Sequence, residues 1–200
     1  MTPNPTTEPH SDTSPTAQTD DWGVLSRLPG NPMMWVLIWS ELVVFGVSFI
    51  GFAVAHILQP DIFTQSQDTL NRFLGGINTM VLVTSGLFTA LAVTAQQQNK
   101  TKQMRWWLSG AIILGGAFLW VKYLEYAEKF SQGIGLETNT FYTLYFLLTG
   151  FHAFHVVFGI IILIIVGWKN STENLEIGAT FWHMVDLIWI ILFPLIYLVR

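Results

Sequence analysis

Five long segments of almost uninterrupted apolar residues constrain this 200-residue chain more than any other feature. They cover residues 33–58, 73–95, 106–126, 141–168 and 179–199. Each segment is long enough to cross a hydrocarbon core about 30 Å thick as an α-helix. Because the connections between them are short, helices adjacent in sequence must run antiparallel. The sequence therefore predicts an all-α integral membrane protein, an up-down bundle of five transmembrane helices.

Composition supports this prediction and excludes other classes. Hydrophobic residues make up 52% of the chain and charged residues only 11%, well below the quarter typical of soluble domains. A β-barrel would need apolar residues at alternate positions, whereas 158–166 is apolar on every face. The chain has no cysteine and a net charge of −4, so we expect neither thiolate metal sites nor nucleic acid as a partner.

The first 32 residues differ in composition from the rest. Residues 1–21 hold six Thr, four Pro and two Ser without an apolar run, which favours a disordered tail. No basic stretch followed by an apolar core precedes the first span, so the tail does not resemble a signal peptide. The sequence Leu28-Pro29-Gly30-Asn31-Pro32 separates this tail from the membrane domain of residues 33–200.

Basic residues at the span ends predict the orientation. With alternating spans, five of them (Arg27, Lys100, Lys102, Arg105 and Lys169) lie on one side and three (Arg72, Lys129 and Arg200) on the other. The positive-inside rule then places the N-terminus in the cytoplasm and the C-terminus outside a bacterial inner membrane. Aromatic residues near the span ends predict interfacial belts. They are Trp35, Trp106, Trp107, Trp168, Trp182, Tyr126, Tyr142 and Tyr197.

Polar residues within the spans are the candidate sites, because an unpaired charge at membrane depth costs a few kcal/mol. Lys122, Glu125 and Lys129 lie on one helix face near the outer end of the third span. We expect them to form an interfacial ion cluster that reaches toward the headgroups.

A second set of polar residues predicts an intramembrane polar network: Glu41, Asn78, His152, His155, His183 and Asp186. The spacing of three residues in His152/His155 and His183/Asp186 puts each pair on one helix face. These groups also suit iron, copper, zinc or bis-histidine haem, so metal ligation stays open as an alternative. The Glu-x-x-His pairs of di-iron bundles are absent.

Several motifs resemble subunit III of the haem–copper oxidases. They are Ser40-Glu41-Leu42, Ile77-Asn78-Thr79, Glu125-Tyr126, Thr149-Gly150-Phe151-His152-Ala153-Phe154-His155 and Trp182-His183-Met184-Val185-Asp186. They occur in family order over residues 33–199. Many members have seven spans, and this chain is similar to the last five. The Leu-Pro-Gly-Asn-Pro sequence and the end of the last span resemble the NorE branch, which is associated with nitric oxide reductase.

The resemblance implies an accessory subunit without a redox centre or catalytic residues of its own. Haem, with copper or non-haem iron, is then expected in a catalytic membrane partner, an oxidase or a nitric oxide reductase. Membrane lipids are expected as further partners, including a bound phospholipid, and the family's membrane carboxylate corresponds to Glu41. The alternatives are subunit III of a cytochrome c or quinol oxidase proper, a histidine-ligated metal or haem enzyme, and a small transporter with a broken helix or an inverted repeat.

Overall fold

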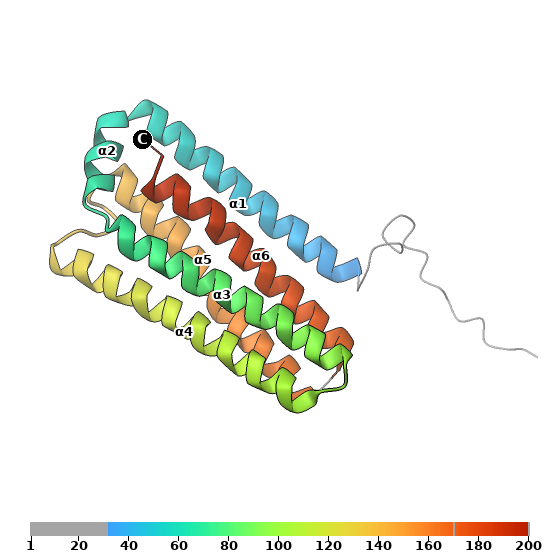
Figure 1. Cartoon of the computed structure of the whole chain (residues 1–200). Coiled ribbons are helices and arrows are strands. Elements are labelled where there is room, and N and C mark those ends of the chain that lie inside the picture. Colours follow the sequence, from blue (N-terminus) through green and yellow to red (C-terminus); the bar gives the residue numbers. More distant parts are fainter. Residues whose placement is uncertain (1–31, 170, 200) are drawn as a thin grey trace, which may run out of the picture.

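The computed structural model describes residues 32–169 and 171–199. All secondary structure in this part of the chain is helical, with five helices long and apolar enough to cross a membrane. Figure 1 shows these five helices side by side, with one short helix at one end. The predicted helical membrane fold is therefore confirmed. The predicted N-terminal tail lies outside the described residues.

The spanning helices extend beyond the apolar segments in several places. Their bounds are α1 Pro32–Leu58, α3 Arg72–Gln97, α4 Thr101–Ser131, α5 Thr140–Lys169 and α6 Thr172–Tyr197. Helix α6 begins seven residues before its apolar segment, and α4 ends five residues after its own. The helical hydrogen bonding continues into the polar residues that flank an apolar segment. Hydropathy therefore marks the apolar part of each helix and not the residues at which the helix begins and ends.

The connection between the first two spans contains a helix that the sequence analysis did not predict, α2 (Pro60–Asp68). Pro60 occupies its first turn, where a missing N–H removes no helical hydrogen bond. Gln67 Nε2 donates to the backbone oxygens of Ile196 and Val199, at 3.0 and 2.9 Å. Helix α2 therefore fastens the end of α6 to the first connection (Figure 1).

Four helices form the centre of the bundle, and α1 lies at its side. Helix α3 packs against α4 and α6, and α5 packs against α4 and α6. Helix α1 meets only α5, α6 and, at its end, α2 among the closely packed pairs. Its buried face consists of Ile38, Phe45 and Phe52, spaced seven residues apart. Most of α1 is therefore left open to its surroundings.

Two glycines let α6 pack closely against α4 and α5. A Cβ built on Gly115 of α4 would lie 2.7 Å from the Trp182 ring, and one on Gly159 of α5 would lie 2.8 Å from it. Trp182, on α6, is fully buried. The small residues therefore make room for the indole at the junction of three helices, as glycines often do in membrane bundles.

The expected aromatic belt is only partly present. Trp106 and Trp168 are exposed near helix ends, as belt residues should be. Trp182, Tyr142 and Tyr197, however, are buried in the bundle. These three rings point into the bundle and so do not form an outward-facing belt, because position along a helix does not reveal which face a residue occupies.

Candidate functional site

A carboxylate and an imidazole meet where α1 crosses α5. Glu41 Oε2 lies 3.1 Å from His155 Nε2, and His155 Nδ1 lies 2.8 Å from the backbone oxygen of Phe151. A carbonyl only accepts, so Nδ1 carries a hydrogen and donates it. The remaining contact needs one more proton, which either Nε2 or the carboxyl group can carry. A hydrogen bond between Glu41 of α1 and His155 of α5 therefore joins the two helices through one shared proton.

The Glu41–His155 pair lies at the edge of the bundle. The Glu41 side chain is 26% exposed and that of His155 is 8% exposed. Both border a small cavity of about 180 Å³ whose other walls are apolar. The lining residues are Leu37, Phe154, Phe158 and Phe181. Membrane components can thus approach the carboxyl group, whereas the imidazole is held inside.

His152, one turn before His155, occupies a different environment. It is fully buried, and its ring lies against that of Trp189 with centroids 5.1 Å apart. Phe45 and Phe118 meet it edge-on. Neither ring nitrogen has a hydrogen-bond partner among the described residues. The structure therefore packs His152 among aromatic rings in the core and does not connect it directly to Glu41.

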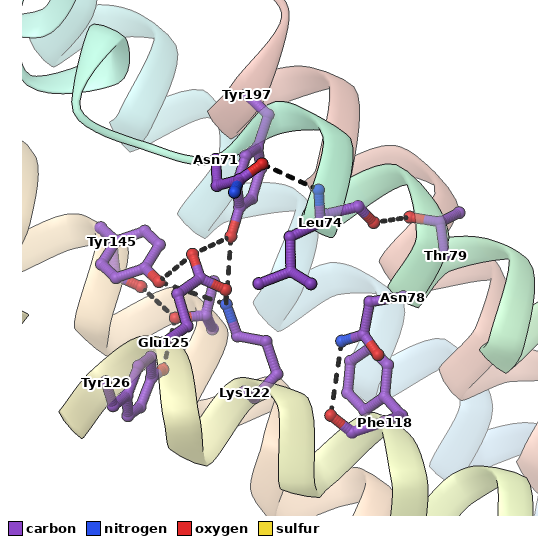
Figure 2. Close-up of polar contacts among 12 residues, drawn as sticks. Asn71, Leu74, Asn78, Thr79, Phe118, Lys122, Glu125, Tyr126, Tyr145 and Tyr197 are labelled. Carbon is purple, nitrogen blue, oxygen red and sulfur yellow. Dashed lines mark hydrogen bonds and ion pairs between the residues drawn. The ribbon is translucent and has the colours of Figure 1, made fainter. Parts of the chain in front are cut away.

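Asn78 joins α3 to α4 rather than to the histidines. Its Nδ2 donates to the backbone oxygen of Phe118 at 3.3 Å (Figure 2). About two turns further along α3, Ser85 Oγ donates a similar hydrogen bond to the backbone oxygen of Ala111 of α4 at 2.8 Å. Thr79 accepts a 3.0 Å hydrogen bond from Trp189 Nε1 of α6. Polar residues of α3 thus bind it to both neighbours by interhelical hydrogen bonds.

His183 and Asp186 form a separate pair on α6. Nδ1 of His183 and Oδ2 of Asp186 are 3.9 Å apart, beyond hydrogen-bond length but within ion-pair distance. Asp186 lies directly against Gly86 of α3, where any Cβ would collide with the carboxyl group. The His183 side chain is 46% exposed and borders a groove of about 470 Å³ between α1, α3 and α6. Glu173 and Glu176 stand along the same groove.

The six residues of the predicted network therefore lie in four separate contacts. Glu41 pairs with His155, and His183 with Asp186. Asn78 and His152 each lie elsewhere in the core. Among residues 32–169 and 171–199, no three His, Asp or Glu side chains are grouped to hold a metal ion.

The third predicted group, Lys122 with Glu125 and Lys129, lies inside the bundle. Lys122 Nζ is 2.9 Å from Glu125 Oε2, and their side chains are only 4% and 7% exposed. Figure 2 shows the pair enclosed by tyrosines from other helices. The expectation that these charges reach toward the headgroups was therefore wrong. Neighbouring helices supply the hydrogen bonds that water would otherwise provide.

Two tyrosines complete this cluster. Glu125 Oε1 accepts hydrogen bonds from Tyr145 of α5 at 2.8 Å and from Tyr197 of α6 at 2.6 Å. The same hydroxyls lie 3.2 and 3.1 Å from Lys122 Nζ. The ammonium is also 5.5 Å from the centre of the Trp189 ring. Since three helices contribute partners, each charge is desolvated but satisfied.

Lys129 is not part of this cluster. Its Nζ donates to the backbone oxygen of Thr69 at 2.7 Å, in the connection between α2 and α3. Thr69 in turn bonds the hydroxyl of Tyr142 on α5 at 2.7 Å. Lys122 and Lys129 lie on one face of α4 but bind different partners, Glu125 and Thr69 O. Their spacing in the sequence does not reveal this difference.

Tyr145 and Tyr197 are the site residues that the sequence analysis missed. Tyr145 lies near the start of α5 and Tyr197 at the end of α6, and both are level with Lys122 and Glu125. A buried ion pair needs donors for the second carboxylate oxygen, and tyrosine hydroxyls at matching depth supply them. That match in depth was the signal available in the sequence.

The five spanning helices and their paired charges define a multi-pass membrane protein whose described polar groups mostly join helix to helix. Comparison with known proteins then assigns the family: residues 33–199 match the family model of cytochrome c oxidase subunit III. The chain belongs to this family. It is a multi-pass inner-membrane protein, like its bacterial oxidase relatives.

Relatives come from both cytochrome c and quinol oxidases. Cytochrome c oxidase subunit 3 of Synechocystis is 29% identical over 168 residues, 80% of this chain and 71% of the relative. Cytochrome bo(3) ubiquinol oxidase subunit 3 of Buchnera aphidicola is 27% identical over 179 residues, 82% and 84% of the two chains. A haem–copper oxidase subunit I+III of Aeropyrum pernix is 29% identical over 181 residues, 83% of this chain and 22% of the relative.

Proposed function

We propose that this chain is an accessory subunit of a respiratory terminal oxidase or nitric oxide reductase, without a redox centre of its own. It supports the stability and turnover of a haem-bearing catalytic subunit in the same membrane. One observation carries the proposal. In the Aeropyrum relative, a region similar to this chain belongs to a protein named subunit I+III, so the two subunits share one polypeptide there. A shared polypeptide favours a constant partnership with the catalytic subunit.

The arrangement of polar residues supports an accessory role over an enzyme. Lys122 and Glu125 are fully occupied by each other and by tyrosines. His152 is enclosed by aromatic rings, which leaves no room around its nitrogens for a haem. The proposal therefore assigns haem, with copper or non-haem iron, to the partner subunit. The role of Glu41, His155, His183 and Asp186 is to hold helices together through polar contacts.

A transporter is less well supported. Many secondary transporters are built from internal repeats and bind substrate at discontinuous helices near the membrane centre. Each of the five spanning helices is continuous from its first residue to its last. The groove beside His183 is instead suited to a membrane lipid, because its walls are mostly apolar, with Met34, Trp35 and Val93 among them. Bound phospholipid is thus part of the proposal.

Within the family, we place the chain in the NorE branch associated with nitric oxide reductase. The support is the Leu28-Pro29-Gly30-Asn31-Pro32 sequence before the first span and the end of the last span, 192–198. Subunit III of a cytochrome c or quinol oxidase is the second candidate, favoured by the names of the relatives. Deleting the gene distinguishes them. We expect loss of nitric oxide consumption, whereas a selective loss of oxygen consumption would favour the second candidate.

The central test is purification of the full-length chain from its native membranes in mild detergent. We expect a haem-bearing membrane protein to copurify, and we expect the chain separated from it to lack stoichiometric haem, copper or iron. Deletion should lower turnover while the haem spectrum of the membranes persists. A stoichiometric metal or haem signal in the isolated chain would overturn the accessory role.

The proposal includes a cytoplasmic N-terminus and an external C-terminus. Because the chain has no cysteine, a single cysteine at Gln98 or Gln132 reports on one side of the membrane. These positions lie in opposite connections, after α3 and after α4. We expect an impermeant thiol reagent applied from outside to label Gln132→Cys and not Gln98→Cys. The reverse pattern would reverse the topology.

A further inference from the structure

Helix α6 turns both ends of the motif 182–186 into the bundle. Trp182 and Asp186 are four residues apart, so their side chains lie one turn from each other on one face of the helix. Both residues are buried, with exposed fractions of 0% and 6%. Trp182 Nε1 and Asp186 Oδ1 have no hydrogen-bond partner among the residues that the structure describes. Within this part of the chain, a buried donor and a buried acceptor are thus unpaired at successive turns.

Trp189, two turns further along α6, shows how a buried indole is paired. Its Nε1 donates to Thr79 Oγ1 of α3 at 3.0 Å. Trp182 is buried as deeply as Trp189, but no described side chain takes the place of Thr79 for its nitrogen. A polar group that is taken out of water without a new partner destabilises the folded state. Ordered water commonly supplies the partner where the chain itself does not.

Helix α3 places a hydroxyl group at the level of Asp186. Ser85 is buried and directly precedes Gly86. At Gly86, any Cβ would collide with the Asp186 carboxyl group. The close approach of α3 to α6 at this glycine therefore fixes Ser85 near the carboxyl group as well.

Helix α4 completes the junction. Ser85 Oγ donates to the backbone oxygen of Ala111 at 2.8 Å, and a hydroxyl oxygen that donates can still accept. One turn further along α4, a Cβ built on Gly115 would lie 2.7 Å from Cη2 and 3.0 Å from Cζ2 of Trp182, on the edge of the ring next to Nε1. Three polar groups, from Trp182, Ser85 and Asp186, therefore converge where α3, α4 and α6 meet.

A groove between α3 and α6 gives this junction room and an entrance. Its volume is about 400 Å³, and Gly86, His183 and Asp186 are among the residues that border it. One water molecule occupies only about 30 Å³ in the liquid. The groove is therefore large enough to admit water to the Asp186 carboxyl group.

We propose that Trp182, Ser85 and Asp186 bind a water molecule inside the bundle. The water accepts a hydrogen bond from the indole N–H, and it donates to the Asp186 carboxyl group and to the Ser85 hydroxyl group. About three hydrogen bonds per molecule are typical of buried water. An acyl chain has neither a donor nor an acceptor, so it does not satisfy these groups. The water joins α3 to α6 and gives the motif 182–186 a structural role that does not depend on the proposed function of the chain.

Radiolytic oxidation tests the site, because hydroxyl radicals formed from a bound water oxidise the nearest aromatic ring. The full-length chain in its native membranes receives a short X-ray pulse, and mass spectrometry measures the oxidation of each tryptophan. Trp189 is the internal control, since it is equally buried on the same helix and is paired with Thr79. We expect Trp182 to be oxidised about threefold faster than Trp189 or more, because only Trp182 has bound water beside it. Equal rates would overturn the proposal.

A conservative variant tests the third partner. Ser85→Ala removes a hydrogen-bond acceptor of the water, so the oxidation rate of Trp182 should fall by about twofold or more. Thr84→Ala is the matched control, because it removes the neighbouring hydroxyl, which donates to Met80 O of its own helix at 2.7 Å. We expect the control to leave the rate unchanged. The water site is refuted if Ser85→Ala leaves the Trp182 rate unchanged or if Thr84→Ala lowers it as much.

Discussion

Two pairs of polar residues in the same bundle differ in how deeply they are buried. The Lys122–Glu125 pair is buried between α4, α5 and α6, and tyrosine hydroxyls satisfy both partners. The Glu41–His155 pair lies at the edge, where Glu41 retains 26% of its side-chain exposure. The first pair is enclosed and holds three helices together. In the second pair the Glu41 carboxyl group is partly exposed, so the comparison distinguishes a structural ion pair from a site that a partner or a lipid can reach.

The most severe test of this comparison is to remove one charge of the enclosed pair. Glu125→Gln leaves the Lys122 ammonium buried without a counter-charge. We expect a loss of about 3–5 kcal/mol in the free energy of unfolding. Denaturation of the purified protein by a graded detergent mixture measures it. Glu128→Gln, at an exposed position on the same helix, is the control and should stay within about 0.5 kcal/mol. Equal effects of the two changes would contradict a structural ion pair.

The next test removes the tyrosine donors. Tyr145→Phe and Tyr197→Phe each delete one hydrogen bond to Glu125 Oε1 while keeping the ring. Each should cost about 1.5–3 kcal/mol in the same denaturation experiment, since hydrogen bonds to charged groups are the stronger ones. Tyr123→Phe, at an exposed position of α4, is the matched control. If Tyr123→Phe cost as much, the hydroxyls would not be what satisfies the carboxylate.

The edge pair should respond more weakly. Glu41→Gln keeps the shape of the side chain and changes the contact with His155. Because Glu41 is partly exposed, we expect a loss of only about 0.5–1.5 kcal/mol in unfolding free energy. A double-mutant cycle with His155→Phe measures the coupling between the two groups. If Glu41→Gln lowered the unfolding free energy as much as Glu125→Gln, the Glu41–His155 pair would be as important for stability as the buried ion pair, and the contrast between the two pairs would be wrong.

The smallest effect is expected at His183. Its imidazole is nearly half exposed and 3.9 Å from Asp186, so His183→Gln should change the unfolding free energy by less than about 0.5 kcal/mol. The same denaturation experiment checks this value. A cost above about 1 kcal/mol would show that His183 and Asp186 support the α3–α6 contact at Gly86.

Sequence reasoning predicted the class of fold because hydropathy acts locally. The apolar segment 73–95 identified α3 without any knowledge of its neighbours. The same reasoning missed α2, because Pro60–Asp68 is polar and its hydrogen bonds are made with residues near the C-terminus, 129 and 132 positions away from Gln67. A short helix whose stability depends on distant partners leaves no periodic apolar signal.

The candidate sites were predicted as residues but not as arrangements. Charged groups within spans are costly, so Lys122, Glu125 and Glu41 could be selected from position alone. Their partners could not be selected, because the face that a helix turns toward its neighbour depends on packing. Tyr197 was expected in an outward-facing belt, and its ring instead points into the bundle, where it binds Glu125. Lys129 was grouped with Glu125 and instead binds Thr69 O.

The sequence by itself determined that this chain crosses a membrane five times, and which few polar groups it carries at membrane depth. The free energy of transfer into lipid depends on each segment's own composition, and this is why no tertiary information was needed. The tertiary structure alone decided that Lys122 and Glu125 are enclosed, that Glu41 reaches His155 and that one face of α1 is left open. These outcomes depend on helix rotation, which is set by close packing such as that of Trp182 between Gly115 and Gly159.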